Sequence, residues 1–364
     1  MKIAHVVSTF LPHVGGMGVV CYNEAKRLAE SGHDVTVFTL KYPRTIYDDK
    51  KFPFKVVRLK PLVRLGDAGL VPQILNNLNG FDLVHLHYPF YGGAEWLCFS
   101  NLPTVITYHM DAQAEGLKGM ISKIYDSFWP KVLFSQAKKI IAVDANHFEN
   151  TKFGKLFSDK VVEIQNGVDT SIFNPHTADL NSLGPAHLKD KNIILFVGNL
   201  LPLKRLDLLL DSMKLLADGN SVLVVVGGGY ELDKYKEMSK DLNNVYFVGQ
   251  CDNPEKLSDY YNAATCVVVP SDYESFSLVA AEASACGKPV VTSNTPAMVG
   301  RVSGGVSGLV FEKGSVESLT GALRKIMTMS AEERRAMGEY GREEIKNKYS
   351  WDKHMEKLKK VYGI

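Results

Sequence analysis

The feature that most constrains the fold is an alternation of short runs rich in Val and Ile with longer segments of helical period. Short apolar runs bounded by turn residues are typical of buried parallel strands that helices connect. The runs in the first half of the chain predict strands at residues 3–7, 35–40, 56–59, 83–87, 104–108, 140–143 and 161–164. A helix is predicted between the first two of these strands, at residues 19–30.

The alternation stops in a polar, irregular stretch at residues 169–190, which we interpret as a linker, and then restarts. The second half predicts strands at residues 193–197, 222–226, 245–248, 266–269 and 290–292. A chain of 364 residues also exceeds the roughly 250–300 residues that one core usually serves. We therefore expect an α/β protein of two doubly wound, Rossmann-like domains that face one another across a cleft. Their expected bounds are 1–172 and 173–347, with a C-terminal helix at about 348–364 packing back on the first domain.

Composition excludes several other classes of protein. The 42 basic and 40 acidic residues nearly balance, so nothing indicates a nucleic acid partner. The five cysteines are scattered without a C-x-x-C pair, which favours a reducing compartment over a disulfide framework. The apolar start of the chain runs into Pro12 without the pattern of a signal peptide or membrane anchor, so we expect a cytoplasmic protein.

The first motif with chemical meaning is Gly15-Gly16-Met17-Gly18, at the start of the predicted helix 19–30. Glycines allow a ligand to approach the backbone closely, and a helix N-terminus offers N–H groups to a phosphate. The motif lacks the G-x-G-x-x-G spacing of dinucleotide folds, which argues against hydride transfer. A plain glycine-rich turn remains the alternative.

The second motif, Gly198-Asn199-Leu200-Leu201-Pro202-Leu203-Lys204-Arg205, follows the first predicted strand of the second half. Lys204 and Arg205 stand where a helix begins, so cationic side chains and helix amides can converge on a diphosphate. A solvated basic pair is the alternative, but a position at a strand's carboxyl end favours a binding site.

The third motif places two glutamates eight residues apart, at Glu274 and Glu282. Glu282 lies in a small, apolar run, where an ionised carboxylate is costly unless hydroxyl groups such as those of a sugar donate to it. The amides of Phe276, Ser277 and Leu278 would stand at the helix N-terminus and hold phosphate oxygens. An N-capping acid plus a surface glutamate explains Glu274 better than Glu282.

Taken together, these residues resemble the retaining glycosyltransferases of the GT-B fold, glycosyltransferase family 4 (the group 1 glycosyltransferases). The resemblance also includes Gly227-Gly228-Gly229 and Gly287-Lys288-Pro289, and it runs along nearly the whole chain. It implies that Lys204 neutralises the donor diphosphate, with Gly198 at the strand end beside it. The other implied roles are ribose binding by Glu282, donor-sugar binding by Glu274, phosphate binding by the amides of Phe276, Ser277 and Leu278, diphosphate or acceptor contact by Gly16, and sugar positioning by His109.

The implied function is the transfer of a sugar from a nucleotide-diphosphate sugar to an acceptor hydroxyl, with retention, in glycan, glycolipid or polysaccharide synthesis. The acceptor would be a sugar, a glycan or a lipid-linked molecule, and no cofactor is expected. Asn199 stands where the family usually has arginine, and Arg205 where it usually has glycine. Two alternatives stay open: a sugar-nucleotide epimerase or phosphorylase on the same fold, and a non-catalytic sugar-nucleotide-binding subunit.

Two further segments suggest other ligands. His85 and His87 alternate on one predicted strand face and His109 lies near another strand end, but a transition-metal site needs three or four convergent ligands, so we expect no metal. The family resemblance implies the same. Residues 117–140 interleave lysines with large apolar side chains. Such a segment, which Pro130 is expected to interrupt, suits either peripheral contact with anionic lipid at the inner face of the membrane or a core-facing helix with solvated lysines.

Overall fold

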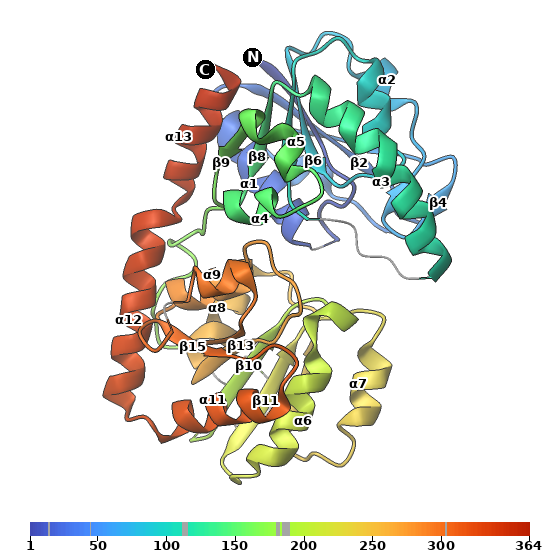
Figure 1. The fold of residues 1–364 in the computed structure, drawn as a ribbon. Helices are drawn as coiled ribbons and strands as arrows, with labels where there is room; N and C mark the ends of the chain where they lie inside the picture. The colour runs from blue at the N-terminus through green and yellow to red at the C-terminus, as the bar shows by residue number, and fades with distance from the viewer. Residues whose placement is uncertain (14, 44, 111–115, 180–182, 184–189, 303) are drawn as a thin grey trace. The chain divides into compact units, whose positions relative to one another are not determined.

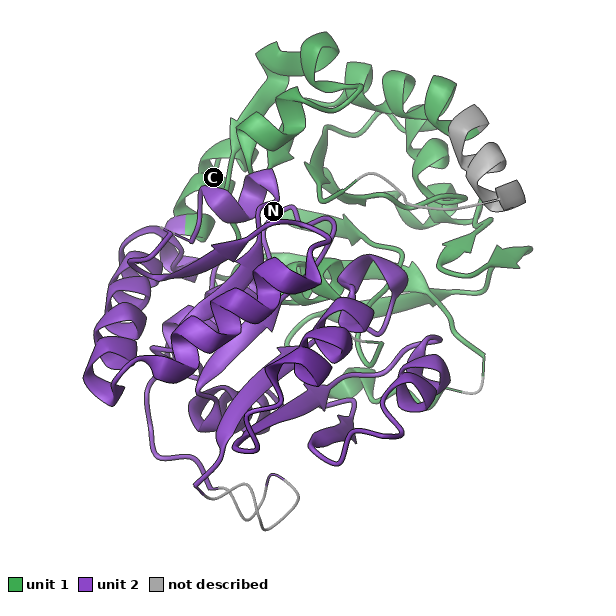
Figure 2. Cartoon of the chain, turned by 60° about the horizontal axis from the view of Figure 1, so that its bottom comes forward, with its two compact units in different colours: residues 1–166, 354–364 green, residues 167–353 purple. Residues whose placement is uncertain are grey.

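The computed structural model describes residues 1–364 except 14, 44, 111–115, 180–182, 184–189 and 303, and it leaves the side chains of residues 116–124 undescribed. The chain divides into two compact units, unit 1 comprising residues 1–166 and 354–364 and unit 2 comprising residues 167–353 (Figure 2). These boundaries differ from the expected 172/173 and 347/348. Part of the predicted linker, at 180–182 and 184–189, lies outside the described residues.

Within the described residues, unit 1 is built on a seven-stranded, wholly parallel sheet of order β3-β2-β1-β6-β7-β8-β9 (Figure 1). Its first strand lies inside the sheet, with two strands on one side and four on the other, so the chain winds outward in both directions, as in doubly wound folds. The strands are β1 Lys2–Val6, β2 Asp34–Leu40, β3 Lys55–Leu59, β6 Leu83–Tyr88, β7 Thr104–Tyr108, β8 Lys139–Ala142 and β9 Val161–Glu163.

Helices cover both faces of this sheet, which explains why the strands are buried on both sides. One face packs against α1 (Gly16–Glu30) and the last part of α13 (Trp351–Tyr362) in a core that joins Ile3, Leu28 and Leu358. The other face forms a second core with α3 (Gly116–Gln136) and smaller elements. These are α2 Ile74–Asn77, α4 Ala145–Glu149, α5 Gly154–Phe157 and the 3-10 turn η2 Ala94–Phe99. Unit 1 also contains the 3-10 turns η1 Asp49–Lys51 and η3 Ser158–Lys160, and the hairpin of β4 Arg64–Leu65 with β5 Ala68–Gly69.

Unit 2 repeats the same winding with a six-stranded parallel sheet of order β12-β11-β10-β13-β14-β15 in the described residues. The strands are β10 Asn192–Val197, β11 Ser221–Val226, β12 Val245–Gly249, β13 Cys266–Val269, β14 Val290–Ser293 and β15 Gly308–Phe311. The helical elements are η5 Pro202–Lys204, α6 Leu206–Leu216, α7 Leu232–Met238, α8 Pro254–Ala263, α9 Leu278–Ala285, α10 Pro296–Val299, α11 Val316–Thr328 and α12 Ala331–Lys348. A capping box between Ser330 and Glu333 fixes the start of α12.

The predicted α/β class and all the predicted strands are confirmed, each strand end within one residue. Three local predictions were incomplete or wrong. The edge strand β15 and the β4–β5 hairpin were missed, because both are short and lie beside glycines. Helix α1 begins at Gly16 and not at Val19. Pro130 lies inside α3 and does not end it, since Leu133 and Phe134 anchor the following turn in the core.

Candidate active site

The loops that follow β10 and β11 in unit 2 interlock through glycine backbone. The amide of Gly198 donates to Val226 O and the amide of Leu200 donates to Gly228 O. A Cβ on Gly227 would lie 1.9 Å from Gly198 O, and one on Gly229 would lie 2.6 Å from Leu200 O. No Cβ atom therefore fits at Gly227 or Gly229. The ends of β10 and β11 present mainly backbone groups here, and such groups are suited to binding a phosphate.

Lys204 and Glu274 meet at the carboxyl end of the unit 2 sheet. The Lys204 Nζ atom donates to Glu274 Oε1 at 2.7 Å, and Ser271 Oγ donates to the same oxygen at 2.8 Å. The side chains of Lys204 and Glu274 are 26% and 11% exposed, so the ion pair is partly accessible to solvent. The structure thus brings together two residues that the sequence placed 70 positions apart.

Arg205 is directed to other carboxylates. It adopts a left-handed backbone conformation with φ of 51° between η5 and α6, and its guanidinium group contacts Asp207 at 3.0 Å and Asp272 at 3.2 Å. The hydrogen bond to Asp207 raises the pKa of Arg205, and Asp272 acts in the same direction. Asn199 is exposed. Arg205 therefore does not present an uncompensated charge in place of the arginine that Asn199 replaces.

Helix α9 carries the second glutamate of the motif. Ser277 has a φ of 59° and caps the helix through its side chain, which accepts from the Ala280 amide at 3.4 Å. Phe276 is buried beneath the Arg301 guanidinium, 3.5 Å from its ring centroid, and Leu278 is the first residue of α9. These contacts fix the direction in which the helix N-terminus points.

Glu282 lies inside α9 and is partly buried. The hydroxyl of Tyr261 in α8 donates to Glu282 Oε2 at 2.8 Å. Burial raises the pKa of Glu282 to about 7, although the Tyr261 hydrogen bond acts in the opposite direction. The remaining acceptor capacity of this carboxylate suits hydroxyl donors from a ligand.

In unit 1 the glycine motif forms the start of α1. Gly15 is the N-cap residue, and the exposed Gly16 is the first residue of the helix. A Cβ on Gly18 would lie 2.7 Å from Thr9 O, so Gly18 lets the helix pack closely on the loop after β1. Gly18 has a packing role, while Gly16 is the glycine that remains accessible.

His109 follows β7 at the carboxyl edge of the unit 1 sheet and is 7% exposed. Its Nε2 atom is 3.0 Å from Nδ1 of His87, and its backbone amide donates to Tyr88 O. Burial lowers the pKa of His109 to about 3, and His354 acts in the same direction. The imidazole is therefore neutral near neutral pH, which suits a hydrogen-bonding role better than that of a cationic acid.

Sequence reasoning missed the residues that hold the predicted site residues in place. Tyr261, Ser271 and Asp272 in unit 2, and His87 as the neighbour of His109, became visible only through strand pairing and helix packing. Tyr261 in particular carries no motif, because a tyrosine on an amphipathic helix is most often an ordinary core residue.

Family models match both halves of the chain: Glycosyltransferase Family 4 over residues 14–172 and Glycosyl transferases group 1 over residues 184–344. The chain is 31% identical over 336 residues to D-inositol 3-phosphate glycosyltransferase 1 of Catenulispora acidiphila, covering 82% of this chain and 79% of that protein. It is 27% identical over 365 residues to an uncharacterized glycosyltransferase of Methanocaldococcus jannaschii, covering 98% and 96%. The crystal structure of Anabaena HepE in complex with UDP-glucose shares the fold, with a TM-score of 0.83 at 16% identity, over 100% and 99% of the two chains.

Proposed function

The chain belongs to the group 1 glycosyltransferases of glycosyltransferase family 4 and has their GT-B type of fold, and from this premise we propose that it transfers a sugar from a nucleotide-diphosphate sugar with retention of anomeric configuration. The observation that carries the proposal is the accessible Lys204–Glu274 ion pair at the carboxyl end of the unit 2 sheet. Ligands of doubly wound sheets bind at that edge.

The ion pair suggests how donor binding begins. A diphosphate competes for the Lys204 ammonium group, because two phosphate charges attract it more strongly than one carboxylate does. The exchange releases Glu274 to accept a hydrogen bond from a hydroxyl of the donor sugar. The N-terminus of α9, at Phe276, Ser277 and Leu278, adds amide donors to the phosphate, and Glu282 accepts from the ribose hydroxyls. The backbone of Gly198 lies beside the same phosphates.

The leaving diphosphate gains its stabilisation from Lys204 and the helix amides, without a metal ion in the chemical step. His109, which is neutral, positions the transferred sugar by hydrogen bonding, and Gly16 allows the substrate to approach the start of α1. The acceptor is a hydroxyl of a sugar, a glycan or a lipid-linked molecule, in glycan, glycolipid or polysaccharide synthesis. The HepE complex contains UDP-glucose, which supports a sugar nucleotide as the donor class.

Thermal stability measured against a panel of UDP-, GDP-, ADP- and CDP-sugars tests the donor site. A ligand at 100 times its dissociation constant adds about 2.7 kcal/mol to the free energy of unfolding. We expect one nucleotide class to raise the melting temperature, and the shift to vanish in Lys204→Ala and Glu282→Ala. Lys214→Ala is the matched control, since it removes an exposed lysine that pairs with Asp211 on α6. A shift that the site variants retain would contradict the assignment.

Product analysis then separates the reactions. Proton NMR of the product gives its anomeric configuration, and retention is expected. An epimerised sugar nucleotide, or a sugar phosphate formed with inorganic phosphate, would instead indicate the epimerase or the phosphorylase.

A second candidate is a sugar-nucleotide-binding subunit without catalysis. The ion pairs of Arg205 with Asp207 and Asp272 favour this second candidate. Arg205 then does not replace the positive charge that relatives with arginine at the position of Asn199 carry. Tight donor binding with no turnover across sugar, glycan and lipid-linked acceptors would support this candidate over the transferase.

Peripheral membrane contact through residues 117–140 is a further part of the proposal. In the described residues no helix is both long and apolar enough to cross a bilayer. The described half of α3 exposes Phe128 by 58% and also exposes Lys131. Pelleting with phosphatidylglycerol vesicles should fall in the double variant Phe128→Ala/Lys131→Glu; equal pelleting of the variant would refute contact through this face.

A further inference from the structure

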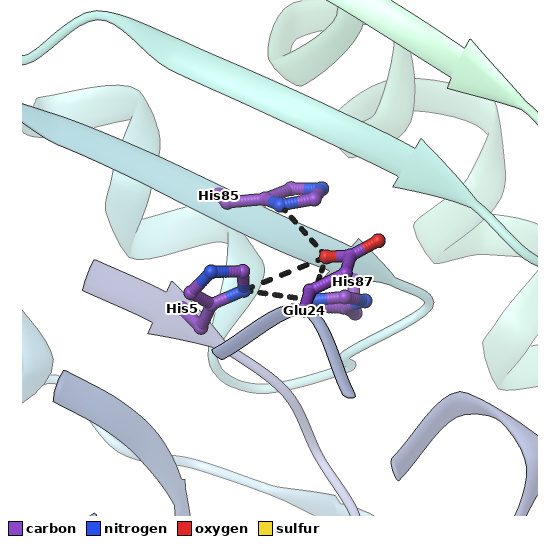
Figure 3. A group of neighbouring side chains, drawn as sticks. All are labelled: His5, Glu24, His85 and His87. Atoms are coloured by element: carbon purple, nitrogen blue, oxygen red, sulfur yellow. Dashed lines mark hydrogen bonds and ion pairs between the residues drawn. The ribbon is translucent and has the colours of Figure 1, made fainter. Parts of the chain in front are cut away.

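Four polar side chains occupy core positions between the unit 1 sheet and helix α1. His5 on β1 pairs in register with His85 on β6, and His87 points to the same face because side chains alternate along a strand. Glu24 of α1 reaches the same point from the helix side (Figure 3). All four side chains are wholly buried, beside a core of apolar side chains.

The potential ligand atoms of these residues converge on one another. Glu24 Oε2 lies 3.3 Å from His85 Nδ1, 3.6 Å from His87 Nε2 and 3.8 Å from His5 Nδ1. His5 Nδ1 is 3.1 Å from His87 Nε2, and all four atoms lie within 4.8 Å of one another. Ligand atoms at about 2.0–2.1 Å from a tetrahedral metal ion are separated by about 3.3 Å, which is close to the four individual distances of 3.1–3.8 Å.

The opposite atom of three of these residues is held by an outer partner. His85 Nε2 contacts Thr107 Oγ1 at 2.7 Å, and His87 Nδ1 contacts His109 Nε2 at 3.0 Å. Glu24 Oε1 is 2.9 Å from His354 Nε2, and the other nitrogen of His354 donates to a backbone carbonyl, Gln165 O, at 2.8 Å. Such outer contacts are how proteins fix the orientation and tautomer of metal-binding side chains.

The cluster does not satisfy itself by hydrogen bonding. Glu24 Oε2 is buried and accepts no hydrogen bond from the described residues, although three imidazole nitrogens face it. The contact between His5 Nδ1 and His87 Nε2 holds one proton between the two ring nitrogens. His85 Nδ1 is 2.6 Å from the Tyr362 hydroxyl, so no N–H is left to donate to Glu24 Oε2. Buried polar atoms in this state cost free energy that a cation at the centre would offset.

We propose that His5, Glu24, His85 and His87 bind one divalent transition-metal ion, with Zn²⁺ as the probe, in a closed structural site inside unit 1. Three imidazoles and one carboxylate are a donor set that such ions accept, and four protein ligands are typical of structural sites. None of these four residues is assigned to substrate binding above, although His87 contacts His109. The proposal departs from the sequence-based expectation of no metal, which was argued from His85, His87 and His109 and from the family resemblance.

One neighbour competes with the ion. The Tyr362 hydroxyl is 2.6 Å from His85 Nδ1, the atom that would ligate. Binding requires this hydrogen bond to break, so Tyr362 either turns aside or becomes a fifth ligand. The bound ion also has a consequence for His109: with Nε2 on the metal, His87 carries its proton on Nδ1 and donates it to His109 Nε2. His109 then keeps its own proton on Nδ1.

Because the site is buried, the ion would enter as the chain folds. The untagged full-length protein is unfolded in denaturant with a chelator, refolded with and without Zn²⁺, dialysed, and analysed by elemental mass spectrometry. We expect about one ion per chain that survives dialysis and raises the melting temperature. Refolding with Co²⁺ should give the strong visible absorption of a tetrahedral ion. Protein that refolds with Zn²⁺ but retains none after dialysis would overturn the proposal.

Variants locate the ion and distinguish it from surface binding. His5→Gln and Glu24→Gln should each lower the retained metal at least tenfold, whereas His176→Gln, which removes an exposed histidine paired with Asp259 in unit 2, should retain it. Tyr362→Phe removes the competing hydroxyl and should retain the metal too. These tests remain decisive if a cluster variant fails to fold, because the wild-type stoichiometry and the Tyr362→Phe result do not depend on it. Metal lost in His176→Gln but kept in Glu24→Gln would refute the site.

Discussion

The same pair of central strands is built from different residues in the two units. In unit 2, Leu195 of β10 pairs with Val267 of β13, and both are wholly buried. In unit 1, the matching strands β1 and β6 pair His5 with His85, which are equally buried. Since the apolar pair builds the same parallel sheet, the fold does not require imidazoles at these positions. Formation of the sheet therefore does not by itself explain the polar residues of unit 1.

The largest expected effect comes from removing the carboxylate at the centre of the unit 1 cluster. Glu24→Ala removes the hydrogen-bond partner of His354 and the carboxylate that the three buried imidazoles face, so we expect a loss of about 3–5 kcal/mol in the stability of unit 1. Hydrogen exchange in peptides covering β1 and β6 measures this loss, and peptides covering β10 and β13 are the internal reference.

Glu30→Ala is the matched control, because Glu30 is on the same helix but exposed, in an ion pair with Lys26 at 4.0 Å. It should change stability by no more than about 0.5 kcal/mol. If Glu24→Ala lowers the stability of unit 1 as little as this control does, the polar residues between the central strands and α1 have no stabilising role. The histidines are then ordinary core residues.

Lys204→Ala tests the polar pair of unit 2. Lys204 and Glu274 lie at the end of a strand and not in the core, unlike the polar cluster of unit 1. We expect donor affinity to fall about 10- to 100-fold, since charged hydrogen bonds contribute about 1.5–3 kcal/mol. The free energy of unfolding should change by under about 1 kcal/mol, because the pair is partly exposed. Calorimetric titration measures the affinity; a large loss of stability with unchanged affinity would make the pair structural.

Glu24 faces four imidazoles, whereas Glu282 has one observed partner, Tyr261. With a pKa raised to about 7 by burial, Glu282 is mainly protonated at pH 6 and ionised at pH 8. If ribose hydroxyls bind the ionised form, donor affinity should rise about tenfold from pH 6 to pH 8. Glu282→Gln should remove this dependence. Affinity that rises equally in the variant would assign the titration to another group.

The same raised pKa gives the opposite trend for stability without donor. A carboxyl group whose pKa rises from 4.5 to about 7 on folding stabilises the protein fully below pH 4.5. This stabilisation is lost as the pH rises through 7. Allowing for its partial exposure, ionised Glu282 costs about 1–2 kcal/mol at pH 8. Glu282→Gln should therefore be more stable than the wild type at pH 8, and no more stable at pH 4.5; thermal melts at the two values test this.

The fold could be predicted from the sequence because parallel strands buried on both faces leave an unmistakable pattern. Runs such as Val222 to Val226 stand between turns, and their order predicts the winding. The sequence did not predict the short elements, because their formation depends on contacts with other parts of the chain and not on a pattern of side chains. The strand β15 has four residues and depends on pairing with β14, and the start of α1 at Gly16 depends on close packing that only Gly18 permits.

The candidate sites were predictable to the extent that their residues lie close together in sequence. Glu274 and Glu282 form a local motif, and Lys204 follows a strand end, so both could be found by reading along the chain. The cluster around Glu24 could not, because His5 and His85 become neighbours only through the β1–β6 register. Glu24, the fourth proposed ligand, joins the histidines only because α1 packs on the same face of the sheet.

The smallest expected effect tests whether unit 2 lacks a charge at its strand end. Asn199 is exposed, and the nearest cation in sequence after Lys204, Arg205, is held by Asp207 and Asp272. Asn199→Arg should therefore strengthen donor binding by about two- to fivefold, the effect of a solvent-exposed ion pair of about 0.5–1 kcal/mol. The gain should shrink as salt is raised, because screening weakens exposed charges first. Titrations at low and high salt, with Asn199→Gln as the uncharged control, measure it. An unchanged affinity would mean that the diphosphate charge is already balanced by Lys204 and the helix amides, and that Asn199 lies away from it.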